Sequence, residues 1–267
     1  MPVRRLGFGA MRITGDGVWG EPRDHDEALR VLRRAVELGV NLIDTADSYG
    51  PEVSENLIAE ALHPYSDDLV IATKGGFLRD GPGRWRPDGR PEHLRAACED
   101  SLRRLKVDRI PLYQFHVPDS NVPYEESIGA MAELQQEGKV RHVGVSNVSV
   151  EQLAVAREIV PVVSVQNRYS VAGRDSEHVL DACEADDLGF IPWFPLGAGS
   201  LDRLAEPLQQ VADAHDATPF QVAIAWLLER SPVMLPIPGT SSVSHLEENM
   251  TAAELELTRE EVALLGG

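Results

Sequence analysis

The chain has 267 residues, and its 43 Asp and Glu residues against 25 Lys and Arg residues give a formal net charge of −18 at pH 7. This acidic balance argues against nucleic acid as a partner, because a phosphate backbone requires a basic surface. A chain of this length can bury a core without disulfides or metal clusters, so we expect one globular domain over residues 1–267. Without a signal-peptide-like or membrane-spanning apolar stretch, the expected location is the cytoplasm.

Short β-type runs alternate with longer amphipathic segments along the whole chain, which is typical of a parallel sheet. The runs are rich in β-branched and aromatic residues and are bounded by polar or glycine-containing turns. Eight strands are predicted, at 5–11, 40–44, 69–74, 110–116, 142–147, 162–166, 190–194 and 234–237.

Helices are predicted between these strands wherever apolar residues recur every three or four positions, as at Leu94, Cys98, Leu102 and Leu105. We expect Cys98 and Cys183 to be reduced core thiols with no metal beside them. Eight strand–helix units in a chain of this length favour an α/β fold of the closed (β/α)8 TIM-barrel type over an open doubly wound sheet. The predicted helices are 26–38, 54–62, 92–105, 124–137, 150–159, 176–185, 219–228 and 258–265, with Gly39, Gly138 and Gly189 as C-terminal caps.

The glycines at 15, 17 and 20 match a dinucleotide-binding pattern just after the first predicted strand. In that motif the third glycine lies inside a helix, whereas here Glu21 and Pro22 follow it. We therefore interpret this segment as a flexible loop.

Reactive side chains end three successive predicted strands, with Asp44, Lys74 and His116 at the ends of the second, third and fourth. Barrel enzymes carry their chemistry at this end of the strands, and neighbouring strands lie about 4.8 Å apart. Asp44 can thus pair with Lys74, while Tyr49 can fold back over both. A lysine ammonium should lower the pKa of a nearby phenol, which could then protonate an oxygen that gains charge during hydride transfer. A structural ion pair is the alternative interpretation.

Seven motifs in order resemble the signature segments of the aldo-keto reductase superfamily across essentially the whole chain. Residues 64–68, 217–232 and 235–250 show a closer resemblance to short bacterial members, several of which are pyridoxal reductases. The motifs are DTADSY at 44–49, ATKGG around Lys74, QFHVPD around His116, GVSN at 144–147, VQNRY at 165–169, WFPLG at 193–197 and IPGT at 237–240 running to Glu248 and Asn249.

The resemblance implies a nicotinamide cofactor, with Tyr49 as general acid and base, Asp44 and Lys74 as the residues that tune it, and His116 orienting the carbonyl. It places the carboxamide at Ser146, Asn147 and Gln166, and the nicotinamide ring on Trp193. The pyrophosphate is expected at Phe194, Leu196, Gly197 and Gly199, and the adenosine end at Gly239, Thr240, Ser241, His245, Glu248 and Asn249.

The choice between NADPH and NADH depends on the residues expected around the 2′-phosphate. NADPH-preferring members carry Lys or Arg around the 2′-phosphate, but the corresponding positions here are Gly239 and His245. Hydroxyls of Thr240, Ser241 and Ser242 with free helix amides could still bind an anion. NADPH is the expected cofactor, and NADH is the alternative.

Three functions are compatible with these residues. The first is reduction of an aldehyde or ketone to an alcohol, with pyridoxal or another small polar carbonyl as substrate and Trp19 and Trp85 as candidate substrate contacts. The second is a cofactor-binding regulatory or sensor protein with little turnover. The third is a Schiff-base enzyme using Lys74, which Asp44 disfavours by keeping the lysine protonated. No obligate protein partner, membrane or metal is expected.

Overall fold

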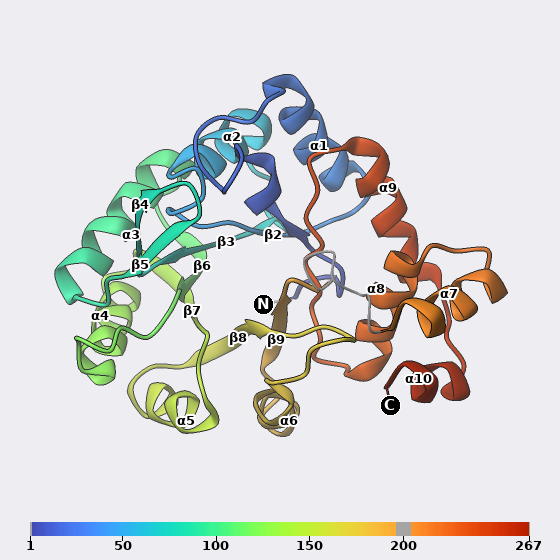
Figure 1. Ribbon diagram of the computed structural model, residues 1–267. Coiled ribbons are helices and arrows are strands. Elements are labelled where there is room, and N and C mark those ends of the chain that lie inside the picture. Colours follow the sequence, from blue (N-terminus) through green and yellow to red (C-terminus); the bar gives the residue numbers. More distant parts are fainter. Residues whose placement is uncertain (1, 196–203, 267) are drawn as a thin grey trace.

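A curved sheet of seven parallel strands organises the fold, and helices cover its outer face (Figure 1). The computed structural model describes residues 2–195 and 204–266. The strand order is β1-β2-β3-β6-β7-β8-β9, so this sheet takes its strands in the order of the chain. The strands are β1 (Phe8–Gly9), β2 (Leu42–Asp44), β3 (Val70–Gly75), β6 (Ile110–Phe115), β7 (Val140–Ser146), β8 (Val162–Arg168) and β9 (Gly189–Trp193).

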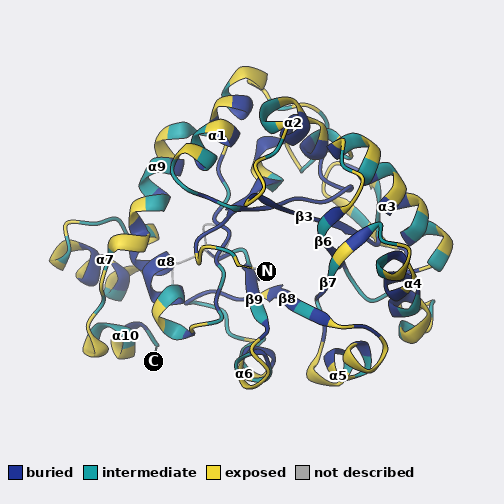
Figure 2. Cartoon of the chain, turned by 180° about the vertical axis from the view of Figure 1, so that it is seen from behind, coloured by how far each residue is buried: buried dark blue, intermediate teal, exposed yellow. Residues whose placement is uncertain are grey.

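The helices follow the sequence signals for starts and buried faces. Helix α5 begins with a reciprocal capping box between Ser149 and Gln152, and α8 with one between Thr218 and Gln221. Each packs its apolar side on the sheet, which Figure 2 shows as buried inner and exposed outer faces. The helices are α1 (His25–Glu37), α2 (Val53–Leu62), α3 (Pro91–Leu105), α4 (Tyr124–Gln136), α5 (Val150–Ile159), α6 (Glu177–Ala185), α7 (Ala205–Ala214), α8 (Pro219–Arg230), α9 (Val243–Thr251) and α10 (Arg259–Gly266), with short 3-10 turns η1 (Ala10–Ile13) and η4 (Ala252–Glu254).

The prediction of a regular eighth strand at 234–237 is wrong. This segment makes an isolated bridge from Met234 to Phe190 of β9, and Leu235 N donates to Phe190 O at 2.8 Å. On its other side Gly7 N donates to Pro236 O at 2.9 Å. Proline has no N–H, so Pro236 and Pro238 prevent a continuous ladder, although the segment lies between the two edges of the sheet.

Two further expectations need correction. The first predicted strand shrinks to β1, because the chain turns into η1 directly after Gly9. The segment 77–90, for which no strand is predicted above, contains the antiparallel hairpin β4 (Phe77–Gly81) and β5 (Arg84–Pro87). The glycine motif at 15–20 does lie in a loop, and α1 begins only at His25.

Glycine caps two of the three predicted helix ends. Gly39 and Gly138 follow α1 and α4 with φ of +92° and +79°. After α6 the left-handed position is taken by Asp187, at φ +54°, while Gly189 opens β9.

Inside the curve of the sheet, alternate strand residues form an apolar layer made by Leu42, Val70, Ala72, Leu112, Ile191 and Ile237. Helix α9, from the C-terminal part of the chain, packs against α1 (Figure 1). Arg34 Nε lies 2.7 Å from Glu247 Oε1, and Val243 N donates to Glu27 Oε1 at 2.9 Å.

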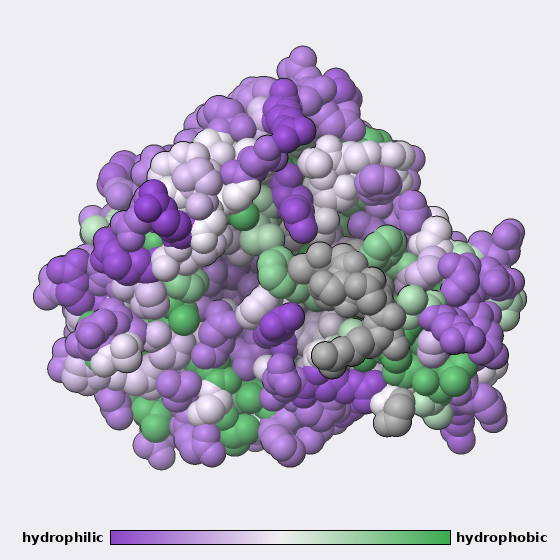
Figure 3. Space-filling view, in the orientation of Figure 1, coloured by the Kyte–Doolittle hydropathy of each residue, from purple (hydrophilic) through white to green (hydrophobic). Residues whose placement is uncertain are grey.

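The surface and the cysteines agree with the composition. Hydrophilic residues cover most of the face in Figure 3. Cys98 and Cys183 are free and buried, as predicted. Within residues 2–195 and 204–266, no helix is long and apolar enough to span a bilayer, and no cluster of His, Cys, Asp and Glu could hold a metal.

Candidate active site

A buried ion pair lies at the carboxyl ends of β2 and β3. Asp44 and Lys74 each stand two residues beyond a member of the apolar inner layer, so the side-chain alternation of strands points both inward. Lys74 Nζ lies 2.6 Å from Asp44 Oδ2 and 2.7 Å from Thr45 O, and the two side chains are 0% and 2% exposed.

Burial disfavours the ammonium form of Lys74, yet its pKa is raised above the usual value because Asp44 and Tyr49 stabilise the charge. A lysine held protonated in this way is a poor nucleophile. The contacts therefore disfavour the Schiff-base interpretation.

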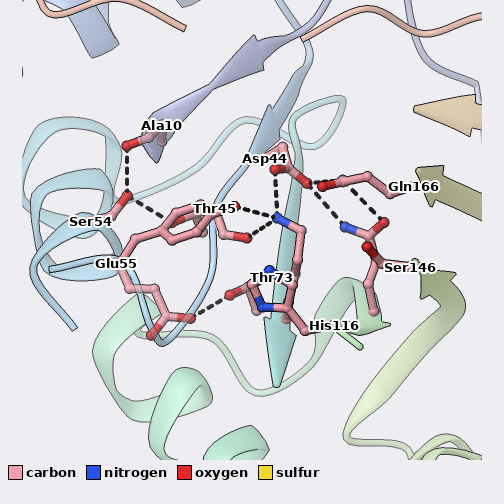
Figure 4. Close-up of polar contacts among 12 residues, drawn as sticks. Ala10, Asp44, Thr45, Ser54, Glu55, Thr73, His116, Ser146 and Gln166 are labelled. Carbon is pink, nitrogen blue, oxygen red and sulfur yellow. Dashed lines mark hydrogen bonds and ion pairs between the residues drawn. The ribbon is translucent and has the colours of Figure 1, made fainter. Parts of the chain in front are cut away.

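The second oxygen of Asp44 is fixed by two amides. Gln166 Nε2 donates to Asp44 Oδ1 at 2.7 Å, as Figure 4 shows, and Gln114 Nε2 donates to the same oxygen at 3.0 Å. Gln114 was missed in the sequence analysis, although it stands two residues before His116 and so shares its inward face. These bonds hold the carboxylate, and through it Lys74, in one orientation.

Tyr49 reaches this pair from the loop between β2 and α2. Its hydroxyl lies 3.4 Å from Lys74 Nζ, and its side chain is buried. The expected fall of the tyrosine pKa is wrong: burial raises the pKa of Tyr49 above its usual value, and the attraction of Lys74 opposes this only in part. Tyr49 is thus a neutral phenol at physiological pH, which is the form that can donate a proton.

His116 packs edge-on against Tyr49 and Phe77, with ring centroids 6.0 and 4.6 Å apart. Burial, together with the charge of Lys74, lowers the pKa of His116 well below its usual value. Among the described residues, Nδ1 of this buried ring has no hydrogen-bond partner. The imidazole is therefore neutral and can donate one hydrogen bond without competing for the proton of Tyr49.

These groups open into a cavity of about 680 Å³. Hairpin β4–β5 contributes Phe77 and Trp85 to its wall, and the β1–α1 loop contributes Arg12 and Val18. The predicted site residues that line it are Asp44, Tyr49, His116, Ser146, Asn147, Gln166, Trp193, Phe194 and Gly239, with Trp85 from the predicted substrate contacts.

The polar wall fits a nicotinamide carboxamide. Asn147 Nδ2 donates to His116 O at 3.0 Å and to Ser146 Oγ at 3.1 Å, and Trp193 Nε1 donates to Asn147 Oδ1 at 3.0 Å. The hydroxyl proton of Ser146, one lone pair of Asn147 Oδ1 and the side-chain oxygen of Gln166 take no part in the hydrogen bonds of the described chain. One donor and two acceptors remain for a carboxamide.

The remaining predicted cofactor residues lie farther along the groove or outside it. Ser241 lines a neighbouring cavity of about 490 Å³ that shares Met11, Arg12, Val18 and Phe194 with the first. Thr240 and Asn249 are buried, His245 is exposed on α9, and Glu248 accepts a hydrogen bond from Thr218 at 2.9 Å. Leu196, Gly197 and Gly199 lie outside the described residues.

Trp19 does not line the main cavity, contrary to expectation. Its backbone bridges Gly50, and its ring lies 5.7 Å from the guanidinium of Arg79. Cavity residues that the sequence analysis did not single out include Met11, Val18, Phe77 and Phe220. Met11 could be found from the sequence because it lies just after the end of β1. No local sequence pattern marks Phe220, which comes from α8.

Asp47 is a second buried acid close to the site. Its Oδ1 has no hydrogen-bond partner among the described residues, and nearby Glu55 is already bound to Thr73 and Arg104. Burial, with a smaller contribution from the charge of Glu55, raises the pKa of Asp47 to about 8. The carboxyl is therefore protonated in the folded protein at neutral pH.

We expect Asp44→Asn to lower the free energy of unfolding by about 3–5 kcal/mol, because it leaves Lys74 buried without its counter-charge. Urea unfolding at pH 7 measures this. Asp80→Asn, which breaks the exposed pair with Arg86, is the matched control and should cost less than about 1 kcal/mol. The double variant Asp44→Asn/Lys74→Met should recover part of the loss; a value for Asp44→Asn within about 1 kcal/mol of wild type contradicts the prediction.

We expect Asp47→Asn to gain stability relative to wild type as pH rises. The unfolded chain releases the Asp47 proton near pH 3.8, but the folded chain holds it to about 8, so between these values the wild type loses stability with rising pH. The difference should grow by about 1.4 kcal/mol per pH unit and level off above pH 8. Urea unfolding of both proteins from pH 5 to 9 checks this, and a pH-independent difference contradicts it.

Comparisons with known proteins agree with this geometry. The aldo/keto reductase family model matches residues 5–266. Pyridoxine 4-dehydrogenase of Escherichia coli is 48% identical, over 99% of this chain and 94% of that protein. The structure of the thermostable aldo-keto reductase Tm1743 with epalrestat is 31% identical, with a TM-score of 0.87 over 99% of this chain and 94% of its own.

An aldo-keto reductase from Klebsiella pneumoniae in complex with NADPH is 28% identical, with a TM-score of 0.83, covering 98% of this chain and 90% of that one. The family match, the relatives and the inward-facing residues at the strand ends agree. This chain therefore belongs to the aldo/keto reductase family of oxidoreductases.

Proposed function

We propose that the protein reduces an aldehyde or ketone to an alcohol with a nicotinamide cofactor, and that Tyr49 is the general acid. One observation carries this: a neutral, buried phenol lies 3.4 Å from a lysine that Asp44 keeps charged. As the carbonyl oxygen gains negative charge, the pKa of that oxygen rises and the Tyr49 proton can move to it. Lys74 then stabilises the phenolate that remains.

The other side chains bind and orient. Neutral His116 donates a hydrogen bond to the carbonyl oxygen, which aligns it with Tyr49. Ser146, Asn147 and Gln166 hold the carboxamide and Trp193 supports the ring, so that the bound cofactor supplies a hydride to the carbonyl carbon. In the reverse direction the phenolate of Tyr49 accepts the alcohol proton.

We also propose that the chain forms one closed (β/α)8 barrel domain, in which residues 234–237 take the position of the eighth strand. The bonds from Leu235 to Phe190 and from Gly7 to Pro236 support closure. Gly9 supports it too, because a Cβ there would lie 2.6 Å from Ile237 O, so only glycine permits this approach. A closed barrel places residues of β1 and of 237–239 on one rim.

For the cofactor we propose NADPH, with Arg12 supplying the cation that position 239 lacks. A side chain at Gly239 would collide with the carbonyl oxygen of Gly9, so no lysine or arginine fits there. The Arg12 side chain lies against Gly239 instead, with its Cγ 3.6 Å from where a Cβ would be. Arg12 is exposed, lines both cavities and has no ion-pair partner among the described residues. The NADPH complex of the Klebsiella relative supports this choice.

For the substrate we propose pyridoxal or a similar small polar carbonyl. The Escherichia coli relative, a pyridoxine 4-dehydrogenase, supports a 4-hydroxymethyl or 4-formyl pyridine. The aromatic walls from Phe77 and Trp85 offer flat surfaces for such a ring.

We expect Tyr49→Phe to reduce turnover of pyridoxal by about 10²–10⁴-fold, because the proton donor is removed. NADPH affinity, followed by indole fluorescence, should stay within about twofold. Oxidation of NADPH at 340 nm with pyridoxal and a panel of small aldehydes and ketones measures the turnover.

Tyr65→Phe is the matched control, since it removes a part-buried hydroxyl bound to Leu105 O, away from the cavity, and should leave turnover unchanged. Wild-type turnover of other carbonyls but not pyridoxal discards that substrate and keeps the reductase. Tight cofactor binding with no turnover of any carbonyl supports the regulatory function instead.

We expect Arg12→Gln to raise KM for NADPH by about tenfold or more while KM for NADH changes by less than about twofold, because a charged hydrogen bond to the 2′-phosphate is lost. Steady-state kinetics with both cofactors measure this. Arg23→Gln is the control: Arg23 lines the neighbouring cavity but is already paired with Asp16 at 2.5 Å. Equal losses for both cofactors contradict the proposal.

A further inference from the structure

Arg79 of β4 joins three segments above the active site. Its Nη1 donates to Val18 O and Ser48 O, each at 2.7 Å, and its Nη2 donates to Gly17 O at 2.9 Å and Gly81 O at 3.4 Å. Its Nε donates to Arg84 O at 3.3 Å. All five N–H groups are thus bound to backbone carbonyls of the β1–α1 loop, the β2–α2 loop and the hairpin.

The same guanidinium lies against two indoles. Its Cζ is 3.7 Å from the ring centroid of Trp85 and 5.7 Å from that of Trp19. Trp85 in turn packs edge-on against Tyr49, Phe77 and His116, with centroids 6.2, 5.4 and 6.4 Å apart. Arg79 therefore fixes the plane of the aromatic ring that faces the reacting groups.

Val18 depends on the same contact. Its φ is +56°, a left-handed conformation that is unfavourable for a β-branched residue. Its carbonyl accepts from Arg79 while its side chain lines the cavity. Two of the cavity walls, Val18 and Trp85, are thus held by one side chain that does not itself line the cavity.

We propose that Arg79 is a positioning residue that sets substrate specificity, fixing Trp85 and Val18 as walls that favour flat aromatic aldehydes over small aliphatic ones. A flat ring gains contact with a fixed Trp85, whereas a short aliphatic aldehyde reaches Tyr49 without that wall. Arg79 does not bind an anionic substrate, because it has no free N–H. This inference rests on the proposed reductase function.

Steady-state kinetics of Arg79→Met with benzaldehyde, 4-carboxybenzaldehyde and propanal test the inference. KM for both aromatic aldehydes should rise by about tenfold, and equally, while KM for propanal changes by less than about twofold and kcat by less than about threefold. Arg79→Lys should not restore KM, because an ammonium lacks the planar five-donor fork. The control Arg86→Met, on the neighbouring strand and paired with Asp80, should resemble wild type.

Other outcomes overturn the inference. A loss confined to 4-carboxybenzaldehyde makes Arg79 an anion ligand, and an equal fall of kcat for all three aldehydes makes it a residue that acts on Tyr49. Trp85→Leu removes the wall directly and should reproduce the KM pattern without adding to Arg79→Met; unchanged aromatic KM values in Trp85→Leu refute the role of the wall even if Arg79→Met does not fold.

Failure of the proposed reductase function can be distinguished from failure of the inference about Arg79. If the wild type reduces none of the three aldehydes with either cofactor, the reductase proposal fails. The near-ultraviolet circular dichroism of the indoles then tests by itself whether Arg79 fixes the ring of Trp85. Arg79→Met should then lose the band that Trp85→Leu loses, while Arg86→Met keeps it. A wild-type spectrum for Arg79→Met overturns the inference.

Discussion

A lysine buried away from water must keep an anion beside it, and in this protein that requirement ties four strands together. Lys74 of β3 needs Asp44 of β2, and Asp44 is held by Gln114 of β6 and Gln166 of β8. The pair is costly to desolvate, so it contributes orientation and a fixed charge rather than net stability. In the proposed mechanism Tyr49 depends on that charge, and the amides of Gln114 and Gln166 hold the charged pair in place.

The strands that form the floor of the site and the loops and hairpin that cover it are held together by different interactions. The floor comes from alternate residues of neighbouring strands, where an apolar layer carries a polar one and the register sets every distance. The roof comes from loops and a hairpin, which have no common ladder and are joined through the Arg79 guanidinium. The proposed catalytic residues therefore lie mainly on rigid strands, while the proposed substrate contacts lie on segments that can change without disturbing them.

The strand-end residues were predictable because parallel strands bring their carboxyl ends together, which is why Asp44, Lys74 and His116 could be grouped from sequence alone. Gln114 obeys the same alternation and was accessible to that reasoning. The hairpin was not, since Phe77 to Pro87 pairs only with itself and is rich in arginine and glycine. The predicted direction of the pKa shift of Tyr49 is wrong, because the sequence shows the neighbouring charge but not the depth of burial that outweighs it.

The contact between α1 and α9 has a consequence for how the protein folds during synthesis. Glu27 accepts a hydrogen bond from Val243 N at the start of α9, Gly7 N donates to Pro236 O, and α1 contacts α9. The segment beside β1 opposite β2 is therefore 234–237, almost two hundred residues farther along the chain than β2. During synthesis the ribosome must release residues 234–251 before these contacts can form. Gly9 and Gly239 therefore come together only after Asp44 and Lys74 are available, so a nascent chain can form the buried ion pair before the proposed cofactor groove is complete.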